Sequence, residues 1–287
     1  MPQTPPKITQ DFLLQRYEVL LIDAFGVLMD SEGALPGAIS FIDQLNQSHK
    51  PYIILSNSAL YNSVQNEVNY RNRGLRIPKE NILTSGMLMP MWIHQQNLSG
   101  GQFLVLGPEP TKNLIRDGGG VIASDDATDV DAIVLGHQSG FDFVTGMDHV
   151  ITLVFKSIEN GKPIPVLVPN PDVIYPKVTG EYGITGGSLA ILLEEALRLR
   201  YPSSTYPLTY LGKPHSPLFE EASRRTKTRN MVMIGDQLDT DIKGASHFGI
   251  DSVLIGTGVT KIENVSSTQK IIPTYFMEKF TTDSLHT

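Results

Sequence analysis

The sequence predicts an α/β protein built on a parallel sheet with helices on both of its faces. Short apolar runs alternate with amphipathic stretches of helical length along most of the 287 residues. Such alternation is typical of parallel strands joined by right-handed helical crossovers. The rhythm of strands and helices also starts afresh in the middle of the chain.

The first predicted strand covers residues 17–22, which are mostly apolar and rich in branched side chains. It ends at Asp23, and Gly26 follows closely, where a glycine allows the backbone to turn sharply. Ligands of open parallel sheets bind beyond the carboxyl ends of the strands, so we expect Asp23 to face the ligand crevice. A carboxylate in that position can attack an electrophile or hold a cation.

The next elements are predicted from the spacing of apolar residues. Ile39, Ile42 and Leu45 fall on one face of an expected helix. Val64 and Val68 lie four residues apart in a more polar one. The resulting prediction for this part of the chain is helices at 38–48 and 61–74 and strands at 51–55 and 81–86.

The same alternation continues to the end of the chain. Glycine pairs and strand-end glycines separate its elements, and no internal repeat interrupts them. We expect strands at 103–107, 131–136, 164–168, 208–211, 231–234 and 251–255, helices at 111–116, 144–160, 188–200, 216–225 and 240–248, and a last apolar stretch at 271–280.

Composition excludes several classes of protein. The chain has no cysteine, which rules out disulfides, thiolate zinc sites and a cysteine nucleophile. Its net charge of −7 argues against nucleic acid as a partner. No apolar segment approaches the roughly 20 residues that span a bilayer, and the first residues lack a secretory signal. We expect a cytoplasmic protein that binds neither nucleic acid nor membrane.

Reactive side chains follow four of the predicted strands. In a parallel sheet these strand ends meet at one edge, whatever their separation in sequence. Two aspartates there suit magnesium, which prefers oxygen ligands. A serine with the backbone amides after it accepts phosphate oxygens, and a lysine offsets phosphoryl charge and keeps a neighbouring carboxylate ionised. The residues are Asp23, Ser56 with Asn57, Lys213, and Asp236 with Asp241.

Four motifs in this order resemble the haloacid-dehalogenase-like (HAD) hydrolase superfamily. Within it the chain is most similar to the class IIA branch of NagD-like and p-nitrophenylphosphatase-like phosphatases. Segments 105–107, 131–136 and 169–172 resemble the cap of that branch, so the resemblance covers nearly the whole chain. The four core motifs are Leu21-Ile22-Asp23-Ala24-Phe25-Gly26-Val27-Leu28, Ile54-Leu55-Ser56-Asn57, Gly212-Lys213-Pro214 and Gly235-Asp236-Gln237-Leu238-Asp239-Thr240-Asp241.

The resemblance implies a Rossmann-like core at 1–85 and 204–287 and an inserted α/β cap at 86–203. It implies that Asp23 is a nucleophile that forms an aspartyl-phosphate, with Ser56 and Lys213 binding the phosphoryl group. Asp23, Asp236 and the backbone carbonyl of Phe25 would ligate Mg²⁺, and Asp241 would orient its waters. The expected substrate-binding residues are Ser56, Asn57, Ser58, Lys213, Asn170 and Asp172.

Phe25 departs from the family pattern. Phosphatases of this superfamily usually carry a second Asp there, which protonates the leaving oxygen and later activates water. A phenyl ring does neither, and acid–base help contributes about 10²–10⁴ in rate. We therefore expect slow turnover unless Asp30, His137 or Asp172 substitutes, or the leaving group needs no proton.

Phe25 also raises the alternative of a haloacid dehalogenase, since those enzymes place an aromatic residue at this position. Their cap and their halide-binding arginine lie between the nucleophile and the serine motif. Residues 24–55 hold no arginine and only a loop and one helix. A dehalogenase is therefore the minor alternative.

The function that we expect is magnesium-dependent hydrolysis of a small phosphorylated metabolite, with sugar phosphates favoured. A phosphotransferase and a non-catalytic protein that binds magnesium and phosphate remain alternatives. A pure binder has no need of a nucleophile, so Asp23 favours an enzyme. The resemblance also implies a homodimer formed through the cap.

Overall fold

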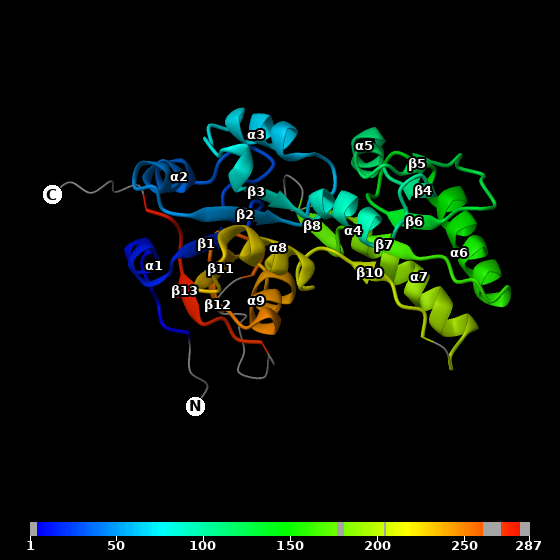
Figure 1. Ribbon diagram of the computed structural model, residues 1–287. Coiled ribbons are helices and arrows are strands. Elements are labelled where there is room, and N and C mark those ends of the chain that lie inside the picture. Colours follow the sequence, from blue (N-terminus) through cyan, green and yellow to red (C-terminus); the bar gives the residue numbers. More distant parts are fainter. Residues whose placement is uncertain (1–4, 177–180, 204, 261–270, 282–287) are drawn as a thin grey trace. The chain divides into compact units, whose positions relative to one another are not determined.

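The computed structural model of the protein describes residues 5–176, 181–203, 205–260 and 271–281 (Figure 1). The chain divides into two compact units. The first comprises Met1–Ser56, Ser63–Leu83 and Lys213–Thr287, and the second comprises Asn57–Asn62 and Thr84–Gly212. Within the described ranges, no helix is both long and apolar enough to cross a membrane.

The first unit is built on a six-stranded sheet with the order β13-β12-β11-β1-β2-β3. The central strand β1 runs parallel to β11 and to β2, and β12 and β13 continue the parallel pairing beyond β11. All four residues of β1 are buried, as expected for a strand covered on both faces. The strands are β1 (Val19–Ile22), β2 (Tyr52–Ser56), β3 (Ile82–Thr84), β11 (Met231–Gly235), β12 (Asp251–Ile255) and β13 (Tyr275–Met277).

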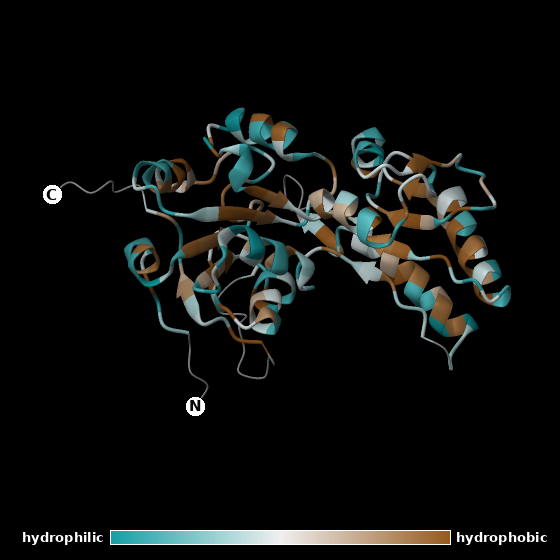
Figure 2. Ribbon diagram, in the orientation of Figure 1, coloured by the Kyte–Doolittle hydropathy of each residue, from teal (hydrophilic) through white to brown (hydrophobic). Residues whose placement is uncertain are grey.

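Helices cover both faces of this sheet, with α2 and α3 on one face and α8 and α9 on the other (Figure 1). Figure 2 shows that the strands are mainly apolar and that the helices carry both polar and apolar residues. The parallel α/β architecture predicted from the alternation of elements is therefore confirmed. The helices are α1 (Gln10–Arg16), α2 (Ala38–Gln47), α3 (Ser63–Arg71), α8 (Pro217–Thr226) and α9 (Lys243–Phe248), with the short turns η1 (Lys79–Asn81) and η4 (Leu238–Ile242).

The spacing of apolar residues identified the buried face of α2 only in part and did not identify that of α3, since Ile42 and Leu45 of α2 are buried as expected. Ile39, placed on the apolar face of α2, is 42% exposed. In α3, Val64 and Val68 are about half exposed, and the buried residues are Asn66 and Tyr70. Helix α3 therefore turns its polar and aromatic side toward the interior, which local hydrophobicity does not predict.

The second unit has its own parallel sheet, with the order β10-β7-β6-β4-β5, and a separate antiparallel pair, β8 and β9. The expected cap, 86–203, lies inside this unit. The strands are β4 (Gln102–Leu106), β5 (Val121–Ile122), β6 (Ala132–Leu135), β7 (Val166–Val168), β8 (Ile174–Pro176), β9 (Tyr182–Ile184) and β10 (Thr209–Tyr210).

Two long helices pack on this second sheet. The apolar faces of α6 and α7 meet β4, β6 and β7 in one buried cluster, which includes Leu106, Leu135, Val154 and Leu193. The unit therefore has a hydrophobic core of its own, as an independent domain requires. Its helices are η2 (Ser85–Leu88), α4 (Met89–Gln95), α5 (Glu109–Asp117), α6 (Phe143–Glu159) and α7 (Gly186–Arg200).

Candidate active site

Asp23 and Asp236 lie at the same edge of the first sheet, because β1 and β11 are parallel neighbours. Ile22 is in register with Ile234, and the Asp23 N–H donates to the Ile234 carbonyl at 2.9 Å. Asp23 directly follows β1 and Asp236 directly follows β11. Both carboxylates are buried, so the sheet brings two negative charges together out of water.

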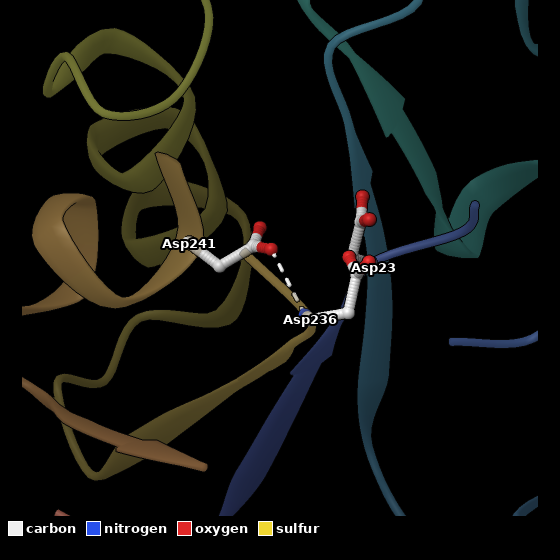
Figure 3. Close-up of side chains that lie close together, drawn as sticks. All are labelled: Asp23, Asp236 and Asp241. Atoms are coloured by element: carbon white, nitrogen blue, oxygen red, sulfur yellow. Dashed lines mark hydrogen bonds between the residues drawn. The ribbon is translucent and has the colours of Figure 1, made fainter. Parts of the chain in front are cut away.

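Asp241 adds a third carboxylate from the π-helical turn η4 (Figure 3). Its Oδ2 accepts hydrogen bonds from the backbone N–H groups of Asp236 and Gln237, each at 3.2 Å. One oxygen of each of Asp23, Asp236 and Asp241 lies within 4.8 Å of the others. Three buried carboxylates this close require a compensating cation.

Lys213 supplies part of that compensation. Its Nζ donates to Asp23 Oδ1 at 2.6 Å, contacts Asp241 Oδ1 at 2.7 Å and donates to the Leu55 carbonyl at 2.7 Å. Burial alone would lower the pKa of Lys213, but the charges of the two aspartates outweigh it and raise the pKa. The two aspartates therefore stabilise the charged ammonium of Lys213.

Asp236 is not neutralised in this way. Burial raises the pKa of Asp236 well above its usual range, and the charges of Asp241 and Asp23 add to the effect. Its Oδ2 accepts from the Val259 N–H at 2.7 Å, but its buried Oδ1 has no hydrogen-bond partner among the described residues. A buried oxygen without a partner, beside two other carboxylates, suits a hard divalent cation such as Mg²⁺.

Two glycines allow the backbone to approach the Asp236 carboxylate. A Cβ added at Gly26, whose φ is +81°, would lie 2.4 Å from Asp236 Oδ2, and one added at Gly258 would lie 2.0 Å from it. The Thr257 hydroxyl donates to the Gly26 carbonyl at 2.7 Å and joins the two loops. The loop after β12 thus belongs to the site. The sequence analysis missed this, although the Gly-Thr-Gly run at the end of a strand was the available signal.

Tyr70 is a second feature that the sequence analysis missed. This buried residue of α3 has its pKa raised by burial and, to a smaller extent, by the charge of Asp23. The phenol is therefore un-ionised and lies in the electrostatic environment of Asp23. The polar residues around Tyr70 in α3 gave no sign that it would be buried or that the charge of Asp23 would affect it.

The predicted phosphate-binding segment begins at the same sheet edge, since Ser56 ends β2, the other parallel neighbour of β1. In the second unit, Asn57 and two of the predicted substrate-binding residues form one cluster. The Asn57 amide donates to Asp172 Oδ1 at 2.8 Å, and the Asp172 N–H donates to Asn170 Oδ1 at 2.9 Å. Ser58 contributes its carbonyl, which accepts from the Ser85 hydroxyl at 3.3 Å.

Phe25 is 38% exposed and follows Asp23 by two residues. Of the proposed substitutes for a second Asp, Asp30 accepts from the N–H groups of Glu32 and Gly33 and so shapes its own loop. In the second unit, Ser139 bonds to His137 Nδ1 through its hydroxyl at 2.9 Å, and burial lowers the pKa of His137.

Comparison with known proteins identifies the family. Two HAD-family models match, a haloacid dehalogenase-like hydrolase model over residues 20–120 and a HAD-hydrolase-like model over residues 210–282. The chain is 26% identical over 264 residues to an acid sugar phosphatase of Staphylococcus epidermidis, covering 91% of this chain and 95% of the relative. It is also 26% identical over 242 residues to a dihydroxyacetone phosphatase of Corynebacterium glutamicum, covering 84% and 81%.

A solved structure of a HAD-superfamily protein is similar to the chain over nearly its full length. It is a HAD-superfamily "possible sugar phosphatase" from Cytophaga hutchinsonii, with a TM-score of 0.84 and 29% identity. The alignment covers 98% of this chain and 100% of the other. Similarity at this level extends across both units.

Proposed function

Since the chain belongs to the haloacid-dehalogenase-like hydrolases, in their class IIA branch, we propose that it is a magnesium-dependent phosphatase of a small phosphorylated metabolite. Relatives named acid sugar phosphatase and dihydroxyacetone phosphatase support a sugar phosphate as the substrate class. The observation that carries the proposal is Lys213, which contacts Asp23 and Asp241 at 2.6 and 2.7 Å in a buried site.

In this proposal Asp23 is the nucleophile. Its carboxylate pairs with the Lys213 ammonium, and a carboxylate oxygen attacks phosphorus as the bond from phosphorus to the ester oxygen of the substrate breaks. The alcohol leaves with a proton from water, and a second water then cleaves the aspartyl-phosphate to release phosphate. The same ammonium offsets the charge of the phosphoryl group, as preorganised cations do in phosphoryl transfer. Ser56, at the end of β2, and the backbone amides after it bind the phosphoryl oxygens.

Asp23, Asp236 and the backbone carbonyl of Phe25 would hold Mg²⁺, and Asp241 would orient its waters. The oxygen-only set suits a hard cation, and the Asp236 Oδ1 without a partner offers a ligand atom. Bound there, the ion would offset charge on the phosphate and align it with the nucleophile. Gly26 and Gly258 have no Cβ, so the loops that contain them can lie against the Asp236 carboxylate.

The family resemblance assigns recognition of the rest of the substrate to a small cluster of polar residues. Asn57, Asn170 and Asp172 form a hydrogen-bonded cluster whose oxygens and amide suit the hydroxyl groups of a sugar. The Asn57 amide donates to Asp172, so the carboxylate has a fixed orientation. We assign substrate selection to this cluster, together with Ser58.

The test is phosphate release from p-nitrophenyl phosphate and a panel of sugar phosphates, measured with Mg²⁺ and with a chelator. Asp23→Asn should abolish release from every substrate. Asp239→Asn, a change of the same chemistry at an exposed residue of η4, should not. Release that persists in Asp23→Asn or in the chelator would refute the proposed mechanism.

A further inference from the structure

Two loops of the first unit enclose one oxygen of the Asp236 carboxylate. The turn after β1 contributes Gly26 and the loop after β12 contributes Gly258, and a Cβ added at these residues would lie 2.4 and 2.0 Å from Asp236 Oδ2. The loop after β12 also donates the Val259 N–H to Oδ2 at 2.7 Å. Oδ2 is therefore held by protein groups. Oδ1, which has no hydrogen-bond partner in the ranges that the structure describes, is the oxygen left to meet a cation.

The loop after β12 holds the main chain of Asp236 as well as its side chain. The Thr260 N–H donates to the Asp236 carbonyl at 3.1 Å. The side chain of Val259 is 46% exposed, so the contact of Val259 with the site is made by its N–H. The loop reaches Asp236 because β12 pairs with β11, with Leu254 in register with Gly235. Its contacts with Asp236 therefore depend on the path of the backbone.

Thr257 is the side chain that joins the two loops. Its hydroxyl donates to the Gly26 carbonyl at 2.7 Å, across 231 residues of sequence. Gly26 is also held from within its own turn, since its N–H donates to the Met29 carbonyl at 2.8 Å. The hydroxyl thus connects a tight turn to the loop that binds Asp236, and it sets how closely the two approach.

From these contacts we propose that Thr257 is a positioning residue for the cation site, an inference that rests on the proposed magnesium-dependent function. Its hydroxyl holds the turn after β1 against the loop after β12, and Asp236 Oδ2 is fixed between them. The carboxylate then has little freedom to rotate, so Oδ1 keeps one direction. Without the hydroxyl, binding of Mg²⁺ has to order the carboxylate and both loops, which opposes binding. Groups that orient metal ligands typically change metal affinity by about 10–100-fold.

The experiment measures the Kd for Mg²⁺ by isothermal titration calorimetry, with no substrate present. Thr257→Val removes the hydroxyl with little change in size, and we expect Kd to rise at least tenfold. Thr257→Ser keeps the hydroxyl, and its Kd should stay within about threefold of the wild-type value. Thr226→Val is the matched control, because the hydroxyl of this half-buried residue of α8 donates to the Ala222 carbonyl at 2.9 Å. It should leave Kd unchanged.

A kinetic measurement separates positioning of the metal site from damage to the chemical step. Thr257→Val should need at least tenfold more Mg²⁺ for half-maximal phosphate release from p-nitrophenyl phosphate. Its rate at saturating Mg²⁺ should return to within about threefold of wild type, since Thr257 touches neither substrate nor nucleophile in this proposal. Thermal unfolding in a chelator checks that each variant folds. Thr257→Ala provides the same comparison if the valine variant does not fold.

An unchanged Kd in the variants without the hydroxyl would overturn the inference and leave the phosphatase proposal intact. A loss of affinity in Thr226→Val or Thr257→Ser equal to that in Thr257→Val would do the same. Absence of Mg²⁺ binding and of Mg²⁺-dependent release in the wild type would overturn the proposed function, and the inference with it. The wild-type measurements thereby distinguish the two failures.

Discussion

Lys213 Nζ lies 2.6 Å from Asp23 Oδ1, although 190 residues separate them in the chain. Both side chains are buried, so each charge depends on the other for compensation. The contact connects the C-terminal segment of the first unit to its first strand. It places a cation beside the proposed nucleophile before any substrate binds.

Replacing Lys213 should therefore cost stability as well as activity. In Lys213→Met, Asp23 and Asp241 lose their common partner, and breaking a buried pair costs about 3–5 kcal/mol. Urea unfolding in a chelator measures this loss. Lys79→Met, at an exposed lysine of the same unit, should change the free energy of unfolding by less than about 0.5 kcal/mol. Equal effects of the two substitutions would contradict the structural role of Lys213.

Asp236→Asn should stabilise the metal-free protein and remove its response to magnesium. The raised pKa of Asp236 means that its charge is unfavourable in the folded state. Neutralising it should raise the free energy of unfolding by about 1 kcal/mol, or the melting temperature by about 2–4 °C. Wild type should instead gain stability from added Mg²⁺.

The stabilisation of the metal-free protein by Asp236→Asn should depend on pH in a direction that the raised pKa of Asp236 determines. An acid whose pKa is higher in the folded state loses stability as pH rises above its unfolded value, about 3.9 for Asp. The advantage of Asp236→Asn over wild type should therefore grow from about pH 4 upward in a chelator. Asp239→Asn, at an exposed residue, is the control. An advantage that shrinks with rising pH, or an undiminished magnesium response, would contradict the assignment.

Gly26→Ala should weaken metal binding more than backbone strain alone explains. Gly26 and Gly100 have nearly the same φ, +81° and +84°, so alanine meets similar strain at both, about 1–2 kcal/mol. A Cβ at Gly26 also meets Asp236 Oδ2 at 2.4 Å, whereas one at Gly100 has nothing within 4 Å. Titration with Mg²⁺, followed by thermal unfolding, should show at least a tenfold weaker response for Gly26→Ala. Similar responses in the two variants would exclude a steric effect on Asp236.

The aspartyl-phosphate should accumulate during turnover. Phe25 stands where the family resemblance implies the carboxyl group that activates water, so we expect the second step to be slow. Rapid mixing with p-nitrophenyl phosphate should give a burst of about one nitrophenolate per active site, followed by a slower steady rate. Acid quenching and mass spectrometry should find the phosphate on Asp23. A linear time course without phosphorylated enzyme would show that the second step is not limiting.

Local pattern was enough to predict most of the strands and the carboxylates that directly follow two of them. Runs of buried branched residues mark β1, β2, β11 and β12, because a strand covered on both faces must be apolar throughout. Asp23 and Asp236 come directly after two of these strands. Their convergence follows from parallel pairing, and this expectation is confirmed by the register of β1 with β11.

The sequence of α3 does not predict which face of this helix is buried. Its two valines are exposed, and Asn66 and Tyr70 are buried. Helical periodicity identifies a stripe of residues, but the neighbours that a stripe meets depend on the packed sheet and its loops. The same limit applies to the loop after β12, whose contact with Asp236 requires β12 to lie beside β11.

The sequence by itself determined the order of the strands along the chain, the residues at their ends and the family to which these motifs belong. The tertiary structure decided which of those residues touch. Lys213 contacts both Asp23 and Asp241, and Asn57 donates to Asp172 across 115 residues. One oxygen of Asp236 has no hydrogen-bond partner in the part of the chain that the structure describes. Strand formation depends on local periodicity. Contacts below 3 Å depend on sheet register and on the close packing of glycine loops, which arise only when distant segments fold together.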